Sequence, residues 1–475
     1  MDLVALAAEA YVYGYPLVRD LSVVEGAMYT GYGPLPPTPF NRFAHADRPV
    51  PPDTPFVSVG DDTVRSVAHL DLSGGAVLIH VPGAPDAPDG RGGPDSAYRV
   101  LQFVDAWTDN FAYVGHRPTA TRTGDWLVVP PGWAGRVPDG VLGVIDAPTS
   151  VVTVLGRSDC DNEDRDGGGH GDGGDHGGGS DGAERVRAFQ EQLTITYVEP
   201  GTHRTGLPAP DPDVPEPLRF FEQLRVWMAD FPPSAPDRAY QDRFQPLGLL
   251  EEGASPYVRA DPVLVRALTE GAARGGARVE EADRADAVRA GWAMQPHLFD
   301  YNLDHYGVGT VDSPEWRITD REASYLTRAV AARSALWGVH GYEAVYARAL
   351  CDAGGGRLNG AHSYVLRFEG RPPAEAGWSL AVYDMAGCGG PGCGVAGRHV
   401  AGSRIGESSA GRVPAYAVDG SLTVRVQRER PDDPVAAANW LPAPDGDFLF
   451  VLRLRAPGTG VLDGTYALPA VERVR

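Results

Sequence analysis

The sequence predicts a mainly β protein with a helical middle, in which an α-helical segment joins two β-sandwich domains. Runs rich in β-branched and aromatic residues, separated by Gly, Pro and Asp, fill residues 55–157, and similar runs return over 361–475. Between them, residues 184–353 show apolar side chains at helical spacing, with Pro-rich breaks. A chain of 475 residues has room for this organisation at roughly 150 residues per domain.

The N-terminal region begins with apolar residues at helical spacing over 2–30, followed by Pro-rich irregular chain. A glycine-rich stretch at 158–183 has too few apolar side chains to offset its ordering entropy, so we expect a disordered loop insertion. The predicted division is 1–54 for the helix and lead-in, 55–200 for the N-terminal β-sandwich, 201–353 for the helical middle and 354–475 for the C-terminal β-sandwich.

Each expected element comes from a local pattern. The clearest helix is expected over 320–351, where an apolar stripe includes Tyr325 and Val339. The expected strands are short runs rich in β-forming residues, separated by turn residues. They are 76–81, 98–104, 126–129, 149–155, 364–368, 378–383, 422–427 and 448–454.

The composition excludes several classes of function. Lys plus Arg total 42 against 63 for Asp plus Glu, a net charge of −21, which argues against nucleic-acid or membrane partners. The chain has no lysine, which excludes Schiff-base, pyridoxal-phosphate and Walker A chemistry. The N-terminus shows no secretory signal, and no apolar window approaches the roughly 20 residues that cross a bilayer. We therefore expect a cytoplasmic protein.

No metal or cofactor motif stands out. Cys388 and Cys393 lie close together, but the sequence shows no second pair of metal ligands to complete a site with them. His170 and His176 lie in the glycine-rich stretch without regular ligand spacing. There is no His-Glu-x-x-His motif, and Gly387-x-Gly389-x-x-Gly392 contains a proline. No cofactor is evident, and a bound divalent metal stays open.

Ordered short motifs resemble a bacterial domain pair. The N-terminal motifs are Tyr11-Val-Tyr-Gly-Tyr-Pro-Leu17, Asp62-Thr63, Leu70-Asp-Leu72, Asp105, Gly115-His-Arg117 and Pro130-Pro-Gly-Trp133. The C-terminal motifs are Pro372-Pro373, Trp378-Ser-Leu380, Tyr383-Asp384, Asp419-Gly-Ser421 and Asn439-Trp-Leu-Pro-Ala-Pro444. They resemble the domains of unknown function numbered twelve fifty-four and twelve fourteen. Tyr325 and Arg328 match the same family's middle helix.

The resemblance implies two β-sandwich domains with a helical segment between them, and it carries over no established reaction. The chain also departs from the family pattern. Gly60-Asp-Asp62-Thr63-Val-Arg65 stands where the family has Asn-x-Asp-Thr-x-Tyr, and this loss weakens the transfer of a site there.

Four residues are candidates for acid–base catalysis. Asp105 lies among aromatics between two expected strands, where a partly apolar setting raises a carboxyl pKa. A carboxylate that accepts hydrogen bonds from loop N–H groups is the structural alternative. Asp62 matches the family pattern, Asp384 ends an expected strand, and His116 is a candidate base. For Asp384 a turn, and for His116 a structural histidine, are the alternatives.

Five residues are candidates for substrate binding. Trp107, Trp378, Tyr383 and Trp440 offer flat surfaces for stacking, although Trp440 equally suits the sandwich edge. Arg453 alternates with leucines and suits a substrate carboxylate, with surface acids as the competing partners.

The leading hypothesis is an intracellular enzyme that acts on a small organic molecule by hydrolysis or elimination, with carboxylate and histidine acid–base chemistry in an interdomain cleft. The alternative is a non-catalytic protein that binds a carbohydrate or another small molecule. An enzyme should place two titratable groups with shifted pKa values in one pocket, whereas a binding protein should show an aromatic shelf. A homo-oligomer is left open.

Overall fold

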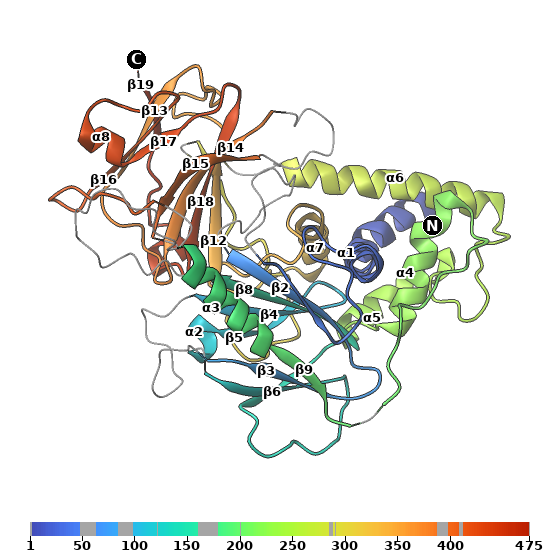
Figure 1. Cartoon of the computed structure of the whole chain (residues 1–475). Helices are drawn as coiled ribbons and strands as arrows, with labels where there is room; N and C mark the ends of the chain where they lie inside the picture. The colour runs from blue at the N-terminus through green and yellow to red at the C-terminus, as the bar shows by residue number, and fades with distance from the viewer. Residues whose placement is uncertain are drawn as a thin grey trace.

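The chain forms groups of β-sheets beside a group of helices in the computed structural model (Figure 1). The residues described are 2–47, 63–83, 98–120, 122–159, 179–199, 201–284, 288–289, 291–386, 398–407 and 412–474. They form four sheets, two from the N-terminal part and two from the C-terminal part, and helices dominate the middle. The prediction of a mainly β protein with a helical middle is therefore confirmed.

The N-terminal strands form two sheets that share one apolar cluster. The five-stranded sheet has the order β1-β2-β8-β4-β5, and the four-stranded sheet has the order β7-β6-β3-β9. Leu70, Phe103 and Val154 from the first sheet join Ile79 and Trp126 from the second in this cluster. The strands are β1 (Phe43–His45), β2 (Thr63–Asp71), β3 (Val77–Val81), β4 (Arg99–Asp105), β5 (Asn110–Gly115), β6 (Gly124–Val129), β7 (Gly143–Asp146), β8 (Val151–Asp159) and β9 (Thr194–Tyr197).

The C-terminal strands repeat this arrangement. A six-stranded sheet has the order β10-β11-β12-β18-β14-β15 and a four-stranded sheet the order β17-β16-β13-β19. Trp378 and Leu452 from the first sheet share an apolar cluster with Phe368 and Val424 from the second. The strands are β10 (Val288–Arg289), β11 (Trp292–Met294), β12 (Ala344–Ala349), β13 (Ser363–Phe368), β14 (Trp378–Asp384), β15 (Arg398–Gly406), β16 (Leu422–Gln427), β17 (Trp440–Pro442), β18 (Phe448–Arg455) and β19 (Val471–Val474). All eight strand expectations from the sequence coincide with strands.

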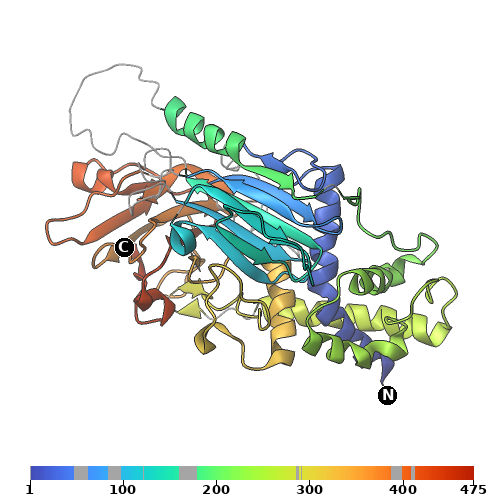
Figure 2. The ribbon, with the colours of Figure 1, turned by 90° about the horizontal axis from the view of Figure 1, so that it is seen from below.

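Helices α4, α6 and α7 pack against the N-terminal helix α1. Helix α1 begins after Asp2, whose side chain accepts hydrogen bonds from N–H groups of the first turn. Figure 2 shows α1 passing under the N-terminal strands towards the other helices. A Cβ atom on Gly14 would lie 2.3 Å from Leu224 in α4, so only glycine allows this close approach. The helices are α1 (Leu3–Tyr29), α2 (His116–Thr119), α3 (Gly179–Gln192), α4 (Arg219–Asp230), α5 (Ala235–Gln241), α6 (Pro262–Arg284), α7 (Arg321–Ser334), α8 (Pro434–Ala438) and α9 (Thr459–Leu462).

The helix expected over 320–351 is wrong in its second half. Helix α7 ends at Ser334, and β12 begins at Ala344 and joins the six-stranded C-terminal sheet. Trp337 has a φ of 61°, in the left-handed region, so the chain cannot continue as a helix there. The apolar residues after it alternate in burial at the period of a strand. The range assigned to the helical middle also contains β10 and β11.

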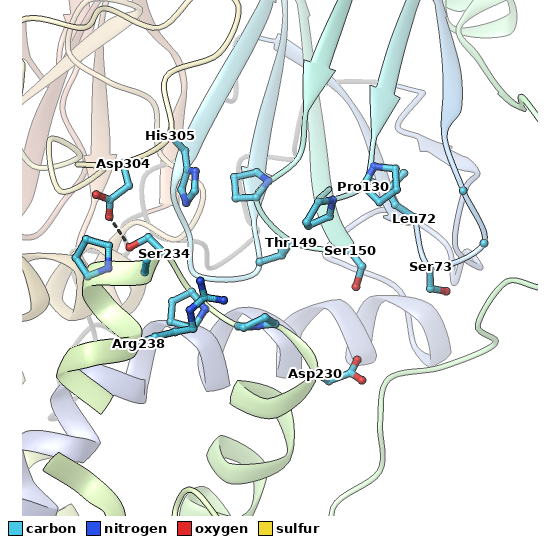
Figure 3. Close-up of a pocket in the computed structure, with 18 residues that line it drawn as sticks. Leu72, Ser73, Pro130, Thr149, Ser150, Asp230, Ser234, Arg238, Asp304 and His305 are labelled. Carbon is cyan, nitrogen blue, oxygen red and sulfur yellow. Dashed lines mark hydrogen bonds between the residues drawn. The ribbon is translucent and has the colours of Figure 1, made fainter. Parts of the chain in front are cut away.

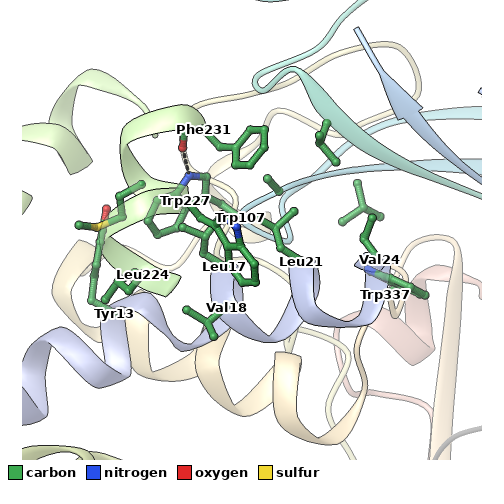
Figure 4. Packing of buried hydrophobic residues seen from close by; sticks show 14 of the residues in the cluster. Tyr13, Leu17, Val18, Leu21, Val24, Trp107, Leu224, Trp227, Phe231 and Trp337 are labelled. Atoms are coloured by element: carbon green, nitrogen blue, oxygen red, sulfur yellow. Dashed lines mark hydrogen bonds between the residues drawn. The ribbon is translucent and has the colours of Figure 1, made fainter. Parts of the chain in front are cut away.

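A large apolar cluster joins α1 to the β4–β5 turn and to α4 (Figure 4). Trp107, on the turn, is 1% exposed, and its Nε1 donates a 2.8 Å hydrogen bond to the backbone carbonyl of Phe231. Tyr13 and Leu17 of α1 belong to the same cluster, as does Trp227 of α4. This packing fixes the helices against one end of the N-terminal sheet, where the candidate site lies.

Helix α1 also buries a carboxyl group, and this has a testable consequence. Asp20 accepts a 2.5 Å hydrogen bond from Trp337 Nε1, and burial raises its pKa to about 8, although that hydrogen bond lowers it. The folded pKa exceeds the unfolded one, so this stabilising contribution is complete below about pH 4 and is lost as the pH rises through about 8. We expect D20N to gain stability over the wild type by roughly 1 kcal/mol per pH unit between pH 6 and 8 in urea unfolding.

D20A is the matched control, because it removes the acceptor as well as the charge and leaves the buried Trp337 N–H without a partner. It should be less stable than D20N by about 1–3 kcal/mol at every pH. A difference between wild type and D20N that does not change with pH would contradict the shifted pKa of Asp20.

Candidate functional site

A pocket of about 950 Å³ opens between the N-terminal sheets and the helices (Figure 3). Its walls come from the turn after β2, the loops on either side of β7, the connection from α4 to α5, and residues 304–305. Six prolines stiffen these walls, because a proline ring fixes its own backbone. They are Pro130, Pro131, Pro148, Pro232, Pro233 and Pro236.

Behind one wall of this pocket lies a small cavity of about 10 Å³ with a polar lining. Its buried groups are Asp105, Asp109, Asp237 and Arg328, and His305 lines both the cavity and the pocket. The volume is near the lower limit for one water molecule. The pocket therefore has a buried network of charged groups directly behind it.

Asp105 organises the turn between β4 and β5. Its Oδ1 accepts hydrogen bonds from the N–H groups of Trp107 at 2.9 Å and Asp109 at 2.8 Å. Thr108 between them has a φ of 70°. Burial raises the pKa of Asp105 well above its usual range, and the nearby Asp109 raises it further. These contacts match the structural alternative, in which the carboxylate satisfies loop N–H groups.

Asp109 and Arg328 form the buried ion pair at the centre of the network. Arg328 Nη2 lies 2.9 Å from Asp109 Oδ1, and both side chains are less than one-tenth exposed. Arg328 also packs over the ring of Tyr301, 5.2 Å from its centroid. Burial raises the pKa of Asp109 to about 7, although Arg328 lowers it. Asp109 is therefore easier to protonate than an exposed carboxyl group.

Arg321, at the start of α7, links the network to the pocket. It donates to Asp237 Oδ1 at 2.7 Å and to both carboxylate oxygens of Asp304, at 2.6 and 2.8 Å. Tyr325 O–H donates to Asp237, and Ser234 O–H donates to Asp304. Burial raises the pKa of Asp304, but the hydrogen bonds from Arg321 and Ser234 outweigh it and lower the pKa overall. Asp304 is thus held as a carboxylate.

His305 presents its imidazole to the pocket (Figure 3). Asn302 holds this loop, because its side chain accepts from His305 N at 3.0 Å and donates to His305 O at 2.6 Å and to Asn110 O at 3.0 Å. Burial lowers the pKa of His305, although Asp304 raises it, so the imidazole is neutral at pH 7. Within the described ranges, no side chain or backbone group hydrogen-bonds to this ring.

The structure places the three described candidates for catalysis in different parts of the fold. Asp105 lines the small cavity, whereas His116 follows the opposite end of the β4–β5 hairpin. Asp384 ends β14 in the C-terminal sheet and accepts a hydrogen bond from the N–H of Ala386, as a turn carboxylate does. Asp62 lies outside the residues that the structure describes, as do Cys388 and Cys393.

The candidate binding residues lie in four different places. Trp107 and Trp378 are each 1% exposed in separate apolar clusters, so neither presents a face to solvent. Tyr383 and Arg453 do meet, since Arg453 Nη2 donates a 2.5 Å hydrogen bond to the buried tyrosine O–H. Trp440 is partly exposed on β17, and its Nε1 donates to the backbone of β16. None of these residues lines the large pocket.

The sequence predictions missed most of the residues that line the pocket and its network. Asp304 and His305 lie in an irregular stretch of charged and aromatic residues, Asp300-Tyr-Asn-Leu-Asp-His305, between the helices of the middle region. Such a stretch was a usable signal, because loops on a rigid scaffold often carry function. The missed residues are Ser234, Asp237, Arg238, Asp304, His305 and Arg321.

Among the residues with described positions, no group of three or more His, Cys, Asp or Glu side chains could hold a metal ion. Across the same residues, no helix combines the length and the apolar character that a membrane crossing requires.

The fold consists of two pairs of sheets and a group of helices, with a polar pocket beside the first pair. The family described as protein of unknown function DUF1254 matches residues 40–197, and that described as protein of unknown function DUF1214 matches residues 343–459. The chain belongs to the proteins that pair a DUF1254 domain with a DUF1214 domain, as its motifs indicate.

A solved structure from Vibrio parahaemolyticus shares this fold. The crystal structure of the VPA0106 protein from Vibrio parahaemolyticus aligns over 100% of both chains, with a TM-score of 0.68 and 20% sequence identity. A putative uncharacterized protein from Burkholderia cenocepacia aligns over 100% of this chain and 95% of its own, with a TM-score of 0.40 and 10% identity. No curated protein matches the chain. The likeness to VPA0106 concerns the fold.

Proposed function

We propose that the chain is an enzyme that acts on a small organic molecule bound in the large pocket, and that His305 accepts a proton from the substrate or from a water molecule. The reaction class is hydrolysis or elimination. The observation that carries the proposal is the neutral imidazole of His305, which faces the pocket with no hydrogen-bond partner among the described residues. A base in this state is ready to take a proton at neutral pH.

A second titratable group supports an enzyme over a binding protein. Asp109 has a pKa of about 7 and lines the same small cavity as His305. Two such groups beside one pocket are typical of acid–base catalysis. The pocket is lined by no Phe, Tyr or Trp from the described residues, so the aromatic shelf expected of a carbohydrate-binding protein is not found there.

The proposal also covers how the two sheets of each pair are arranged. Each pair of sheets, with its shared apolar cluster, forms a β-sandwich, and the substrate binds between the N-terminal sandwich and the helices.

Proton NMR in D₂O tests the role of His305. The protein is incubated with small organic acids, esters and amides, and each spectrum records both exchange of carbon-bound protons and new products. We expect the wild type to convert or exchange at least one compound, and H305N to lose this rate by about 10²–10⁴-fold.

H362N is the matched control, because His362 lies just before β13 in the C-terminal part and pairs with Arg473. It should keep the rate of the wild type. Equal rates for H305N and the wild type would remove His305 from the mechanism. Binding without exchange or products in the wild type would instead support the non-catalytic alternative.

A further inference from the structure

We propose that the substrate in this pocket is an organic anion, and that its carboxylate or phosphate head binds to the guanidinium of Arg238. This inference rests on the proposed function, because it names the substrate class of the same site. It depends on which polar groups of the pocket wall already form hydrogen bonds or ion pairs within the protein.

Most polar side chains on the pocket wall already form hydrogen bonds or ion pairs within the protein. Ser73 O–H donates to Asp71, Ser234 O–H donates to Asp304, and Thr149 O–H donates to the carbonyl of Val151. The two carboxylates of the wall are also paired. Asp304 binds Arg321 through two oxygens, and Asp230 forms an ion pair with Arg204. These groups therefore shape the pocket and leave little capacity for a ligand.

Three polar side chains on the wall have no such partner within the described part of the chain. They are Ser150, Arg238 and His305, none of which forms a side-chain hydrogen bond or ion pair there. Arg238 lies on α5, and Figure 3 shows its guanidinium directed into the pocket. Asp230 and Asp304 each pair with an arginine, so among the described lining residues Arg238 is the charged side chain without an ion-pair partner.

A guanidinium without a carboxylate partner suits an oxyanion. It presents a planar set of N–H donors that matches a carboxylate or a phosphate through two parallel hydrogen bonds. The six prolines of the walls suit an apolar body behind that head group, and their fixed backbone keeps the pocket open before the ligand arrives. The expected ligand is therefore a small anion with an apolar body.

An NMR titration with three probes of the same body tests the inference. Benzoate, phenyl phosphate and the neutral benzamide are titrated into the full-length protein. We expect benzoate or phenyl phosphate to bind more tightly than benzamide, and the tighter anion identifies which head group the pocket prefers. R238Q should weaken the binding of that anion at least about tenfold, since it loses charged hydrogen bonds. R238K keeps the positive charge but loses the planar set of N–H donors, so its affinity for the anion should lie between those of the wild type and R238Q.

R266Q is the matched control, because Arg266 is exposed on α6, has no ion pair among the described residues and does not line the pocket. It should bind as the wild type does. Equal anion binding by R238Q and the wild type would overturn the inference, and so would equal binding of benzamide and both anions.

The variant H305N separates this inference from the proposed function. If H305N binds the anion normally but lacks turnover, both stand. If H305N keeps turnover while R238Q loses binding, Arg238 recognises the anion and only the role of His305 falls.

Discussion

Replacing Arg328 with methionine is expected to lower the free energy of unfolding by about 3–5 kcal/mol at pH 8. The guanidinium pairs with Asp109 at 2.9 Å and lies 4.0 Å from Asp237 Oδ2, deep beneath the pocket. Methionine fills much of the same space without a charge. Asp109 would then be buried without its cation, and an unpaired buried charge is far more costly than the pair itself. Urea unfolding of the wild type and R328M measures the difference.

The defect of R328M should depend on pH in a defined direction. Burial already raises the pKa of Asp109 to about 7 while Arg328 opposes the rise, so removing the arginine raises this pKa further. A carboxyl group with a raised folded pKa gives its full stability below the unfolded pKa and loses it as the pH rises through the folded one. The loss in R328M should therefore shrink as the pH falls from 8 to 5.5.

The double variant R328M/D109N provides the control. It removes the pair together and leaves a neutral amide in place of the stranded carboxylate. We expect it to be more stable than R328M at pH 8, with a weaker dependence on pH. If R328M lowers the free energy of unfolding by less than about 1 kcal/mol, independently of pH, the buried network contributes little to stability and the prediction is wrong.

The strands could be predicted because their patterns are local. Runs rich in β-branched and aromatic residues between turn residues define each strand without information from the rest of the chain, and β4 and β18 are clear cases. The end of α7 is different. An apolar stripe continues past Ser334, but Ala335 already leaves the helical conformation, with φ −152° and ψ 41°. Trp337 follows in the left-handed region and is held by a hydrogen bond to Asp20 in α1, which only the tertiary structure supplies.

The site could be predicted only in part, for a similar reason. Asp105 was found because it lies between two strands with aromatic neighbours, and the structure places it behind the pocket. Its partners come from distant segments, since Arg328 lies on α7 and Asp237 on α5. No spacing in the sequence relates these residues to Asp105. The pocket itself forms from loops of the N-terminal sheets and the helices, so its lining is a property of the fold.

Trp107→Ala is expected to lower the free energy of unfolding by about 3–5 kcal/mol, the largest loss we expect from an apolar substitution in this region. The indole is 1% exposed, packs 5.2 Å from the ring of Tyr13 and donates to the carbonyl of Phe231. Alanine would remove contacts that join α1, α4 and the β4–β5 turn in one cluster. Urea unfolding at pH 7 measures the loss.

Trp107→Phe separates packing from substrate contact at this position. Phenylalanine keeps most of the apolar volume but removes the indole N–H, so the loss should fall to about 1–3 kcal/mol from the unpaired carbonyl of Phe231. Trp107 lines the small cavity but not the large pocket. Anion binding in the NMR titration should therefore be unchanged in this variant. Weaker binding with near-normal stability would instead give Trp107 the substrate contact that the sequence predicts, and would extend the binding site through the wall into the cavity of Asp105 and Asp109.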